Sequence, residues 1–350
     1  MSEHESMFRP HLDRMAGYVP GEQPREAGFT KLNTNENPYP PSPRVFEAIR
    51  SALDGRLRLY PDPVGNRFRR IAAELHGVDP EMILVGNGSD DILTIITRSF
   101  VGPGDVVAYP TPSYILYRTL AELQDARAVE IPFEDDWNWD PDRVAAARPR
   151  LVFLANPNSP SGTVIASDRL VALSERLDCP LVVDEAYVDF ANEHAVGLVS
   201  RRPNVIVTRS LSKGYGLAGL RVGYAIAPRP IIEGLLKVKD SYNCDALSLA
   251  GGAAALEDRA YLAETRARIV ATRERLTAAA RSLGYRTTES SANFVWCTGR
   301  PDAVGVYERL KERKILVRLM RYPGIEPGLR ITVGTDGEID RLLEVWRSVV

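Results

Sequence analysis

One lysine stands in a setting suited to covalent chemistry. The chain has only six lysines against 38 arginines, and Lys213 lies in RSLSKGYGLAGLRVGY (209–224), directly after an apolar run. A lysine that attacks an aldehyde must be partly deprotonated near neutral pH, which burial and neighbouring cations favour. The serines and glycines around it would let a bulky ligand approach the backbone. Taken alone, a solvated surface lysine is the commoner case, so the neighbouring motifs decide whether Lys213 bonds covalently to a carbonyl compound.

Two nearby features have the residue types that bind a phosphate group. Arg221 offers a planar guanidinium fork, and hydroxyl donors accompany it at Ser210 and Ser212. In GNGSDD an expected strand ends in glycines and a helix begins, so free backbone N–H groups and the helix dipole face one point. Ser89 and Asp90 also suit the N-cap of that helix, and capping is compatible with phosphate binding.

A carboxylate stands where ligands bind in open α/β sheets. In LVVDEAYVDF (181–190), Asp184 ends an apolar strand, at the carboxyl edge of the expected sheet. A protonated pyridine nitrogen would give this carboxylate a partner, and the pairing would keep the ring able to draw electrons from a substrate carbanion. Tyr187 is placed to hydrogen-bond a hydroxyl group on such a ring. On the sequence alone, pairing of Asp184 with an arginine remains the alternative.

These side chains need a scaffold, and the apolar pattern predicts one. Between residues 80 and 227, short apolar runs alternate with helical patterns, as in a mainly parallel sheet with helices on both faces. Several runs lack polar alternation, which is typical of strands buried on both faces. The expected strands are 83–88, 105–110, 151–155, 181–184, 204–210 and 222–227.

The C-terminal third has a different pattern of apolar residues. One long helix is expected over 259–283, followed by strands at 293–298, 315–320 and 329–334. A length of 350 residues favours about two units. We therefore expect an α/β fold with three parts: an arm at 1–30 that joins the smaller domain, a large doubly wound domain at 31–255, and a small α+β domain at 256–350.

Composition narrows the class of function. A net charge of -2 without a basic stripe argues against nucleic-acid partners, and no apolar run approaches the length of a membrane span. Without a leader-like N-terminus, a cytoplasmic protein is expected. Cys179, Cys244 and Cys297 are expected to be reduced, and the four histidines lack metal-ligand spacing, so no metal is expected.

The chain resembles the fold-type I, class II aminotransferases that depend on pyridoxal 5'-phosphate, and among them the histidinol-phosphate aminotransferase family. The resemblance covers almost the whole length. The matching stretches, in order, are GYVPGEQP, KLNTNENPYPPSP, LYPDP, GNGSDD, YPTPSYILY, NPNSPSG, VVDEAYVDF, RSLSKGYGLAGLRVGY and LRITVG.

The resemblance implies a pyridoxal phosphate site with Lys213, Asp184 and Tyr187 as catalytic residues. It adds Tyr114, which would stack on the pyridine ring, and Tyr60, which would reach the cofactor phosphate of the neighbouring subunit in a homodimer. The remaining cofactor contacts implied or argued above are Ser89, Asp90, Asn158, Ser159, Ser210, Ser212 and Arg221. The family pattern N-P-N-N-P-T-G reads NPNSPSG here, so Ser159 replaces the asparagine that bonds the ring hydroxyl. Either Ser159, Asn158 or Tyr187 then makes that contact.

The same resemblance implies the substrates. Arg330 would clamp the α-carboxylate of glutamate or 2-oxoglutarate, and Arg318 would bind the phosphate of histidinol phosphate or imidazole acetol phosphate. Tyr18 and Asn35 are the other expected substrate contacts. The implied reaction belongs to histidine biosynthesis. An aromatic amino acid aminotransferase, a decarboxylase of the same fold and a non-catalytic relative remain alternatives.

Overall fold

The computed structural model describes residues 6–17, 21–24, 26–134 and 137–350. Its large sheet has seven strands in the order β2-β8-β7-β6-β5-β3-β4. Neighbours from β4 to β7 are parallel, whereas β8 runs antiparallel to both β7 and β2. The strands are β2 (Ile83–Gly86), β3 (Val106–Thr111), β4 (Arg127–Pro132), β5 (Leu151–Ala155), β6 (Leu181–Asp184), β7 (Val205–Ser210) and β8 (Gly223–Ile226).

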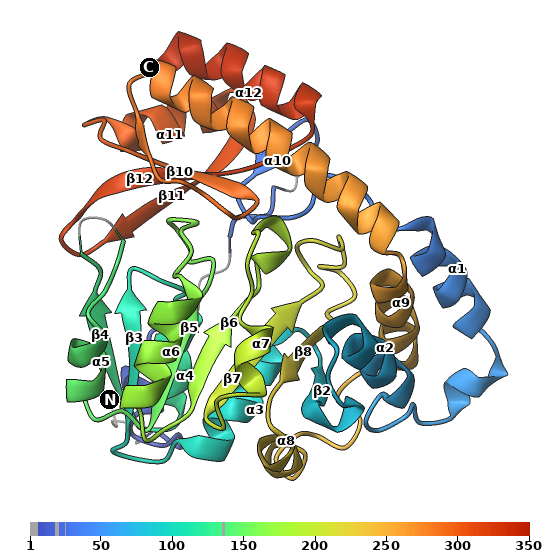
Figure 1. The fold of residues 1–350 in the computed structure, drawn as a ribbon. Helices are drawn as coiled ribbons and strands as arrows, with labels where there is room; N and C mark the ends of the chain where they lie inside the picture. Colours follow the sequence, from blue (N-terminus) through green and yellow to red (C-terminus); the bar gives the residue numbers. More distant parts are fainter. Residues whose placement is uncertain (1–5, 18–20, 25, 135–136) are drawn as a thin grey trace.

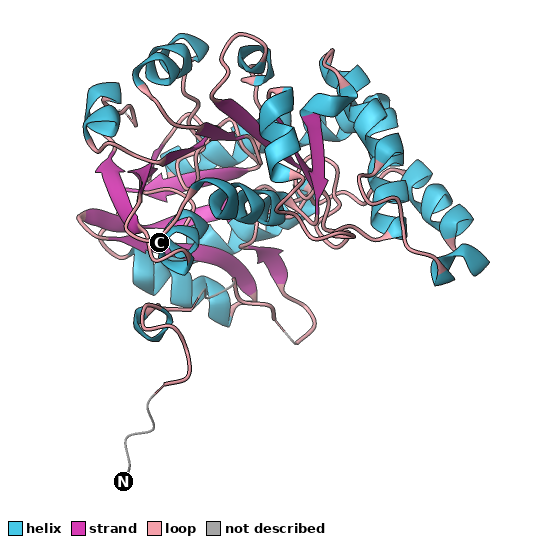
Figure 2. Ribbon diagram, turned by 90° about the horizontal axis from the view of Figure 1, so that it is seen from below, coloured by secondary structure: helices cyan, strands magenta, loops and turns pink. Residues whose placement is uncertain are grey.

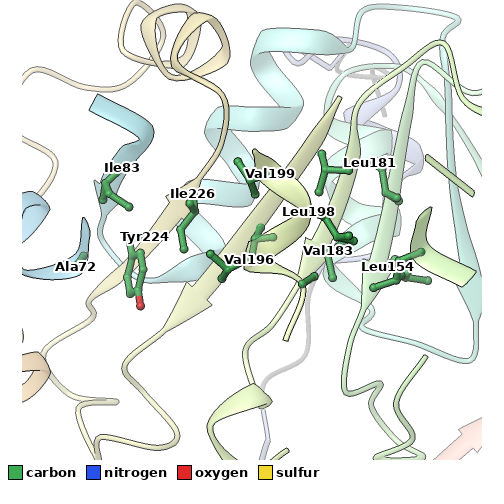
Figure 3. Packing of buried hydrophobic residues seen from close by; sticks show 14 of the residues in the cluster. Ala72, Ile83, Leu154, Leu181, Val183, Val196, Leu198, Val199, Tyr224 and Ile226 are labelled. Carbon is green, nitrogen blue, oxygen red and sulfur yellow. The ribbon is translucent and has the colours of Figure 1, made fainter. Parts of the chain in front are cut away.

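Helices cover both faces of this sheet, as Figure 1 shows. Side chains alternate between the two faces along each strand, so Val183 packs in one buried cluster and Val182 in the other. Figure 3 shows part of the first cluster, in which Val183 lies close to Leu198 of a covering helix and Leu154 and Leu181 lie further along the same face. The mainly parallel doubly wound sheet expected from the sequence is confirmed, and β4 is the strand that was not expected.

The remaining elements of the large domain follow the chain. The helices are α1 (Pro43–Ala52), α2 (Asn66–His76), α3 (Ser89–Phe100), α4 (Leu116–Leu123), α5 (Pro141–Ala146), α6 (Ser167–Arg176), α7 (Val196–Val199), α8 (Arg229–Leu235) and α9 (Ala246–Glu257). Short 3₁₀ turns lie at η1 (Leu12–Arg14), η2 (Gly55–Arg58), η3 (Pro80–Met82) and η4 (Val188–Phe190). None of the described helices combines the length and the apolar character needed to cross a bilayer.

A second, five-stranded sheet lies above the first in Figure 1. Its strands, in spatial order, are β1 (Thr30–Leu32), β11 (Ile315–Tyr322), β12 (Ile325–Thr332), β10 (Phe294–Thr298) and β9 (Arg286–Thr287). It packs against α10 (Arg259–Ser282), α11 (Ala303–Glu312) and α12 (Asp336–Val349), around a core that includes Leu276 and Trp346. The long helix α10 runs from beside α9 to this layer (Figure 1), so it connects the two units.

The N-terminal segment touches both units. Arg9 donates to the carbonyl oxygen of Leu123, and His11 lies 3.8 Å from Asp125, both in the large domain. Figure 2 shows η1 beyond the edge of the main body. Further on, β1 pairs in parallel with β11, so Thr30–Leu32 belong to the small sheet. The segment before α1 therefore contacts both units.

Candidate active site

The expected site residues converge because three parallel strands end together. Ala155 of β5, Asp184 of β6 and Thr208 of β7 are register partners across the sheet. The segments that follow these strands therefore meet at one edge. They carry Asn158 and Ser159 after β5 and the loop with Lys213 after β7.

Lys213 lies half-buried between the two units. Its Nζ atom donates to the carbonyl oxygen of Thr34 (3.2 Å) and lies 5.8 Å from the centre of the Tyr187 ring. The Asn37 amide holds the loop by donating to the carbonyl oxygens of Lys213 and Gly214, each at 2.9 Å. The lysine amine is thus held on a fixed loop and faces the space beside Tyr187.

Asp184 is a buried carboxylate without a cation. It is 4% exposed, and no lysine or arginine of the described chain lies within ion-pair distance of it. Tyr117 donates to it at 2.8 Å, and Thr208 and the Ala186 N–H donate at 3.2 Å each. Burial raises the pKa of Asp184 to about 6, although the hydrogen bond from Tyr117 opposes the rise. Such a group would be stabilised by a cationic partner in the adjacent space.

The two expected phosphate-binding features form one cup. Nη1 of Arg221 lies 3.5 Å from the Ser212 hydroxyl, and the Ser212 N–H donates to the Ser210 hydroxyl. Nη2 of Arg221 lies 3.4 Å from Asp90 in the first turn of α3. Gly88 precedes that helix with φ of 86°, and a Cβ there would stand 2.6 Å from Arg221. The glycine therefore allows the guanidinium to lie against the start of α3, where N–H groups need an external acceptor.

Tyr187 is fixed by a residue from the crossing segment. Asn35, with φ of 55°, donates from its amide to the Tyr187 hydroxyl oxygen at 3.0 Å. Thr332 of β12 donates to the Asn35 amide oxygen, also at 3.0 Å. Asn35, expected to contact substrate, thus lies beside Tyr187 and links it to the small sheet.

The two arginines expected to bind substrate are cross-strand partners. Arg318 on β11 and Arg330 on β12 are in register, so their side chains leave the same face of the sheet. Arg330 donates to Ser159 (2.9 Å) and to the carbonyl oxygen of Asn33 (3.1 Å). Arg318 lines a hollow of about 230 Å³ that also includes Asn33 and Arg321. Two guanidinium groups therefore stand on one face, next to the loop after β5.

Three expected tyrosines have different outcomes. Tyr114 donates to Asp90 (3.1 Å) and stands edge-on to Tyr117, so it lies at the candidate site. Tyr60 stacks on Tyr242, with ring centroids 4.3 Å apart, and is 79% exposed. No contact of Tyr60 with Lys213 is found within the described protomer. Tyr18 lies outside the described residues.

Two tyrosines were not expected at the site. Tyr117 is fully buried on α4 and donates to Asp184; its only sequence signal is its position three residues after Tyr114 in YPTPSYILY. Tyr322 ends β11, and burial raises its pKa to about 12 while the charges of Arg330 and Arg318 oppose that rise. Tyr322 is therefore close enough to both arginines to be affected by their charge.

The residues present fit pyridoxal phosphate. Asp184 has the buried position and the missing cation that a pyridinium nitrogen would satisfy. The cup of Arg221, Ser210, Ser212 and the start of α3 suits a phosphate group. Lys213 follows Ser212 directly and supplies an amine beside Tyr187. A ring with a nitrogen, an aldehyde and a phosphate therefore has one matching group at each position.

Comparisons with known proteins agree with this geometry. The family of class I and II aminotransferases matches residues 27–345. The histidinol-phosphate aminotransferase of Rhodopirellula baltica is 50% identical over 95% of this chain and 93% of its own length. Histidinol-phosphate aminotransferase 1 of Trichormus variabilis is 46% identical over 98% of this chain and 99% of its own length.

A solved structure gives the same result. The histidinol-phosphate aminotransferase of Sinorhizobium meliloti, in complex with pyridoxal-5'-phosphate, superposes with a TM-score of 0.90 at 29% identity, covering 99% of this chain and 100% of that one. The fold-type I architecture and the pyridoxal phosphate dependence expected from the sequence are therefore confirmed. The chain belongs to the class I and II aminotransferase family and, within it, to the histidinol-phosphate aminotransferases.

Proposed function

We propose that this enzyme transfers an amino group between histidinol phosphate and 2-oxoglutarate, giving imidazole acetol phosphate and glutamate. The observation that carries the proposal is the register pairing of Arg318 with Arg330. Like charges directly opposite each other on neighbouring strands are destabilising, so this arrangement is favoured where anions bind. One substrate carries a phosphate and the other carries carboxylates, and both need charge-assisted hydrogen bonds.

Each residue of the site has a defined task. When bound, pyridoxal phosphate supplies an aldehyde that takes up the amino group and a ring that withdraws electrons from the substrate carbon. Asp184 keeps the ring nitrogen protonated. The amine of Lys213 would hold the cofactor and, when free, would move a proton at the substrate carbon. Arg221, Ser210 and Ser212 retain the phosphate.

Tyr114 and the substrate arginines complete the assignment. Tyr114 faces Asp90 at the start of α3 and offers a flat ring against the cofactor. Arg330 is already held at two points, which prepares its fork for a carboxylate. Arg318, beside the hollow, is the proposed partner of the substrate phosphate. Asn35 and Tyr18 are proposed to close the pocket.

Substrate competition tests the proposal. We expect kcat/KM with 2-oxoglutarate to be higher for histidinol phosphate than for phenylalanine, and Arg318→Ala to reverse that order. A charge-assisted hydrogen bond contributes about 1.5 to 3 kcal/mol, so the loss for histidinol phosphate should be about tenfold to a hundredfold. Glutamate turnover serves as the control for Arg330. A wild-type preference for phenylalanine would identify an aromatic aminotransferase instead.

Lys213 is tested by trapping the cofactor. Borohydride reduction of the holoenzyme followed by peptide mapping should locate the cofactor on Lys213. Lys213→Ala should abolish transamination while the fold remains intact, because the lysine lies in a loop already held by Asn37. Recovery of the reduced cofactor on Lys31, Lys237 or another lysine would contradict the assignment of the whole site.

We also propose that two chains form a symmetric homodimer. Around η2 and α1, one face exposes an unusual group of large apolar side chains: Phe46, Leu53, Leu57, Leu59, Tyr60 and Tyr242. Three of them, Leu57, Leu59 and Tyr60, line a hollow of about 540 Å³. Contiguous exposed apolar surface of this kind favours a protein interface. A two-fold axis beside it would let Tyr60 of each chain complete the phosphate cup of the other.

Two measurements test the homodimer. Leu57→Glu should shift sedimentation toward the monomer, whereas Val304→Glu, at another exposed apolar position, should not. Mixed dimers of Lys213→Ala and Tyr60→Ala chains should regain one active site. If proven mixed dimers recover no activity, Tyr60 does not act across the interface.

A cytoplasmic location is the remaining proposal. Cys179, Cys244 and Cys297 are all buried and free. Unpaired cysteines are typical of proteins that work in a reducing compartment. Fractionation of cells that express the tagged full chain, followed by activity measurement, tests this.

A further inference from the structure

Three side chains compete for one contact of the cofactor, the hydrogen bond to its ring hydroxyl: Asn158, Ser159 and Tyr187. Asn158 is 1% exposed, and its amide is already fully engaged. Its nitrogen donates to the carbonyl oxygen of Pro112 and to Ser161, while its oxygen accepts from Ser113. Asn158 therefore shapes the loop after β5 and has no amide proton left for a ligand.

Ser159 is turned toward the substrate arginine. Its hydroxyl oxygen accepts from Nη1 of Arg330 at 2.9 Å, and the residue is 6% exposed. At the other end of the guanidinium, Nη2 donates to the carbonyl oxygen of Asn33. The Phe294 ring packs beside it, 5.4 Å from the guanidinium carbon. Ser159 is thus one of two fixed acceptors that set the direction of the Arg330 fork.

Tyr187, like Ser159, accepts a hydrogen bond and keeps its own hydroxyl proton, but its ring lies beside Lys213. Its hydroxyl oxygen accepts from the Asn35 amide, which leaves its own proton free to be donated. Its ring is fixed edge-on against Phe294, with centroids 5.1 Å apart, and lies beside the Lys213 amine. Among the three candidates, Tyr187 is the one that combines a free proton with a position next to the lysine.

We propose that Ser159 is a positioning residue for Arg330, and that Tyr187 alone of the three donates to the ring hydroxyl. The two residues then have separate tasks. Ser159 affects binding of the carboxylate substrate, and Tyr187 affects the ring hydroxyl of the cofactor. The inference rests on the proposed function, because it takes Arg330 as the carboxylate clamp.

Kinetics with both substrates tests the first half. Ser159→Ala should raise KM for 2-oxoglutarate by about three- to tenfold, as expected for one lost hydrogen bond. KM for histidinol phosphate, which has no carboxylate, should stay within twofold. Thr163→Val, which removes a hydroxyl bonded to Ser161 in the same loop, is the matched control and should leave both values unchanged. An equal rise for both substrates in Ser159→Ala would overturn the positioning role.

A double-mutant cycle provides a second measurement. If Ser159 acts through Arg330, then Ser159→Ala should add almost nothing to the KM of an Arg330→Lys enzyme. Additive effects of the two substitutions would overturn the proposal. Lack of histidinol phosphate turnover in the wild type is a different result and would reject the proposed function itself.

Absorbance of the bound cofactor tests the second half without turnover. A donor to the ring oxygen favours its ionised form, so losing that donor should raise the pH midpoint of the visible absorbance change. Tyr187→Phe should raise the midpoint by about one unit, and Ser159→Ala should leave it within a few tenths of a unit. A shift in Ser159→Ala as large as that in Tyr187→Phe would show that Ser159 bonds the ring.

Discussion

Asp184 and Glu185 are adjacent at the end of β6, both are buried, and their charges are met in different ways. Glu185 lies 2.8 Å from Arg209 of β7, which also has Asp189 at 3.7 Å. Asp184 receives hydrogen bonds from Tyr117 and Thr208 but has no cation among the described residues.

The difference separates a structural charge from a functional one. Burial raises the pKa of Glu185, and the charge of Arg209 opposes that rise within the same chain. For Asp184, the opposing effects come from hydrogen bonds, and its pKa remains raised to about 6. A buried carboxylate that the fold leaves without a counter-charge is a place where a ligand can supply one.

Removing the charge of Asp184 should have the largest effect. We expect Asp184→Asn to lower kcat by about a thousandfold, or about 4 kcal/mol in the barrier, because an amide cannot keep the ring nitrogen protonated. Cofactor affinity should fall much less, since the proposed phosphate cup of Arg221, Ser210 and Ser212 is unchanged. Single-turnover kinetics and a cofactor titration measure the two effects. A variant with more than a tenth of the wild-type kcat would contradict the role of Asp184.

Removing the cation from the cluster of Glu185, Asp189 and Arg209 should lower the stability of the protein. Arg209→Met leaves Glu185 and Asp189 buried without their cation, so the free energy of unfolding should fall by about 3 to 5 kcal/mol. Urea unfolding measures the loss. Arg176→Met is the matched control, because it removes an exposed ion pair with Asp142 and should cost about 1 kcal/mol or less. Equal losses in the two variants would remove the contrast between buried and exposed pairs.

Stability as a function of pH should distinguish the two neighbours directly. Because the folded pKa of Asp184 is about 6 and its ordinary value is 3.8, the native apoprotein holds a proton that the unfolded chain has already lost. Between pH 5 and pH 8 this group should therefore lower wild-type stability by about 1 kcal/mol.

Asp184→Asn should abolish that loss, so its apoprotein should gain stability relative to wild type as pH rises. Glu185→Gln should instead be less stable than wild type at pH 8, because Arg209 loses its closest counter-charge. Thermal unfolding of the cofactor-free proteins at both pH values provides the measurement. The expectation fails if the difference between Asp184→Asn and wild type does not change with pH.

The local sequence predicts where Asp184 and Glu185 lie in the sheet. It does not predict which side chains pair with them. The apolar runs at 151–155 and 181–184 are strong enough to predict parallel strands, and a carboxylate at the end of one marks the ligand edge. The pairing of Glu185 with Arg209 depends on the register of β6 with β7, across 24 residues of chain. No local pattern specifies that register.

The strand β4 and the contact of Tyr117 with Asp184 are also not predicted by the sequence. β4 is an edge strand whose residues are largely exposed or half-buried, so it lacks the continuous apolar run of the central strands. The role of Tyr60 across a dimer interface rests on the resemblance and stays a prediction; within one chain it stacks on Tyr242. The distance of Tyr117 from Asp184 depends on how α4 packs against α3, β3 and β4, which sets the Tyr117 ring on Phe153.

The smallest expected effect concerns that tyrosine. Tyr117 is fully buried, stacks on Phe153 with centroids 4.7 Å apart, and donates to Asp184. Tyr117→Phe keeps the ring packing and removes only the hydrogen bond, so Asp184 loses one of the groups that orient it toward the ring nitrogen. We expect kcat to fall about fivefold, or about 1 kcal/mol. Tyr109→Phe is the matched control, since it removes a buried hydroxyl bonded to Glu130 in the same aromatic cluster. If both variants keep the wild-type kcat, Asp184 is oriented by Thr208 and the backbone alone.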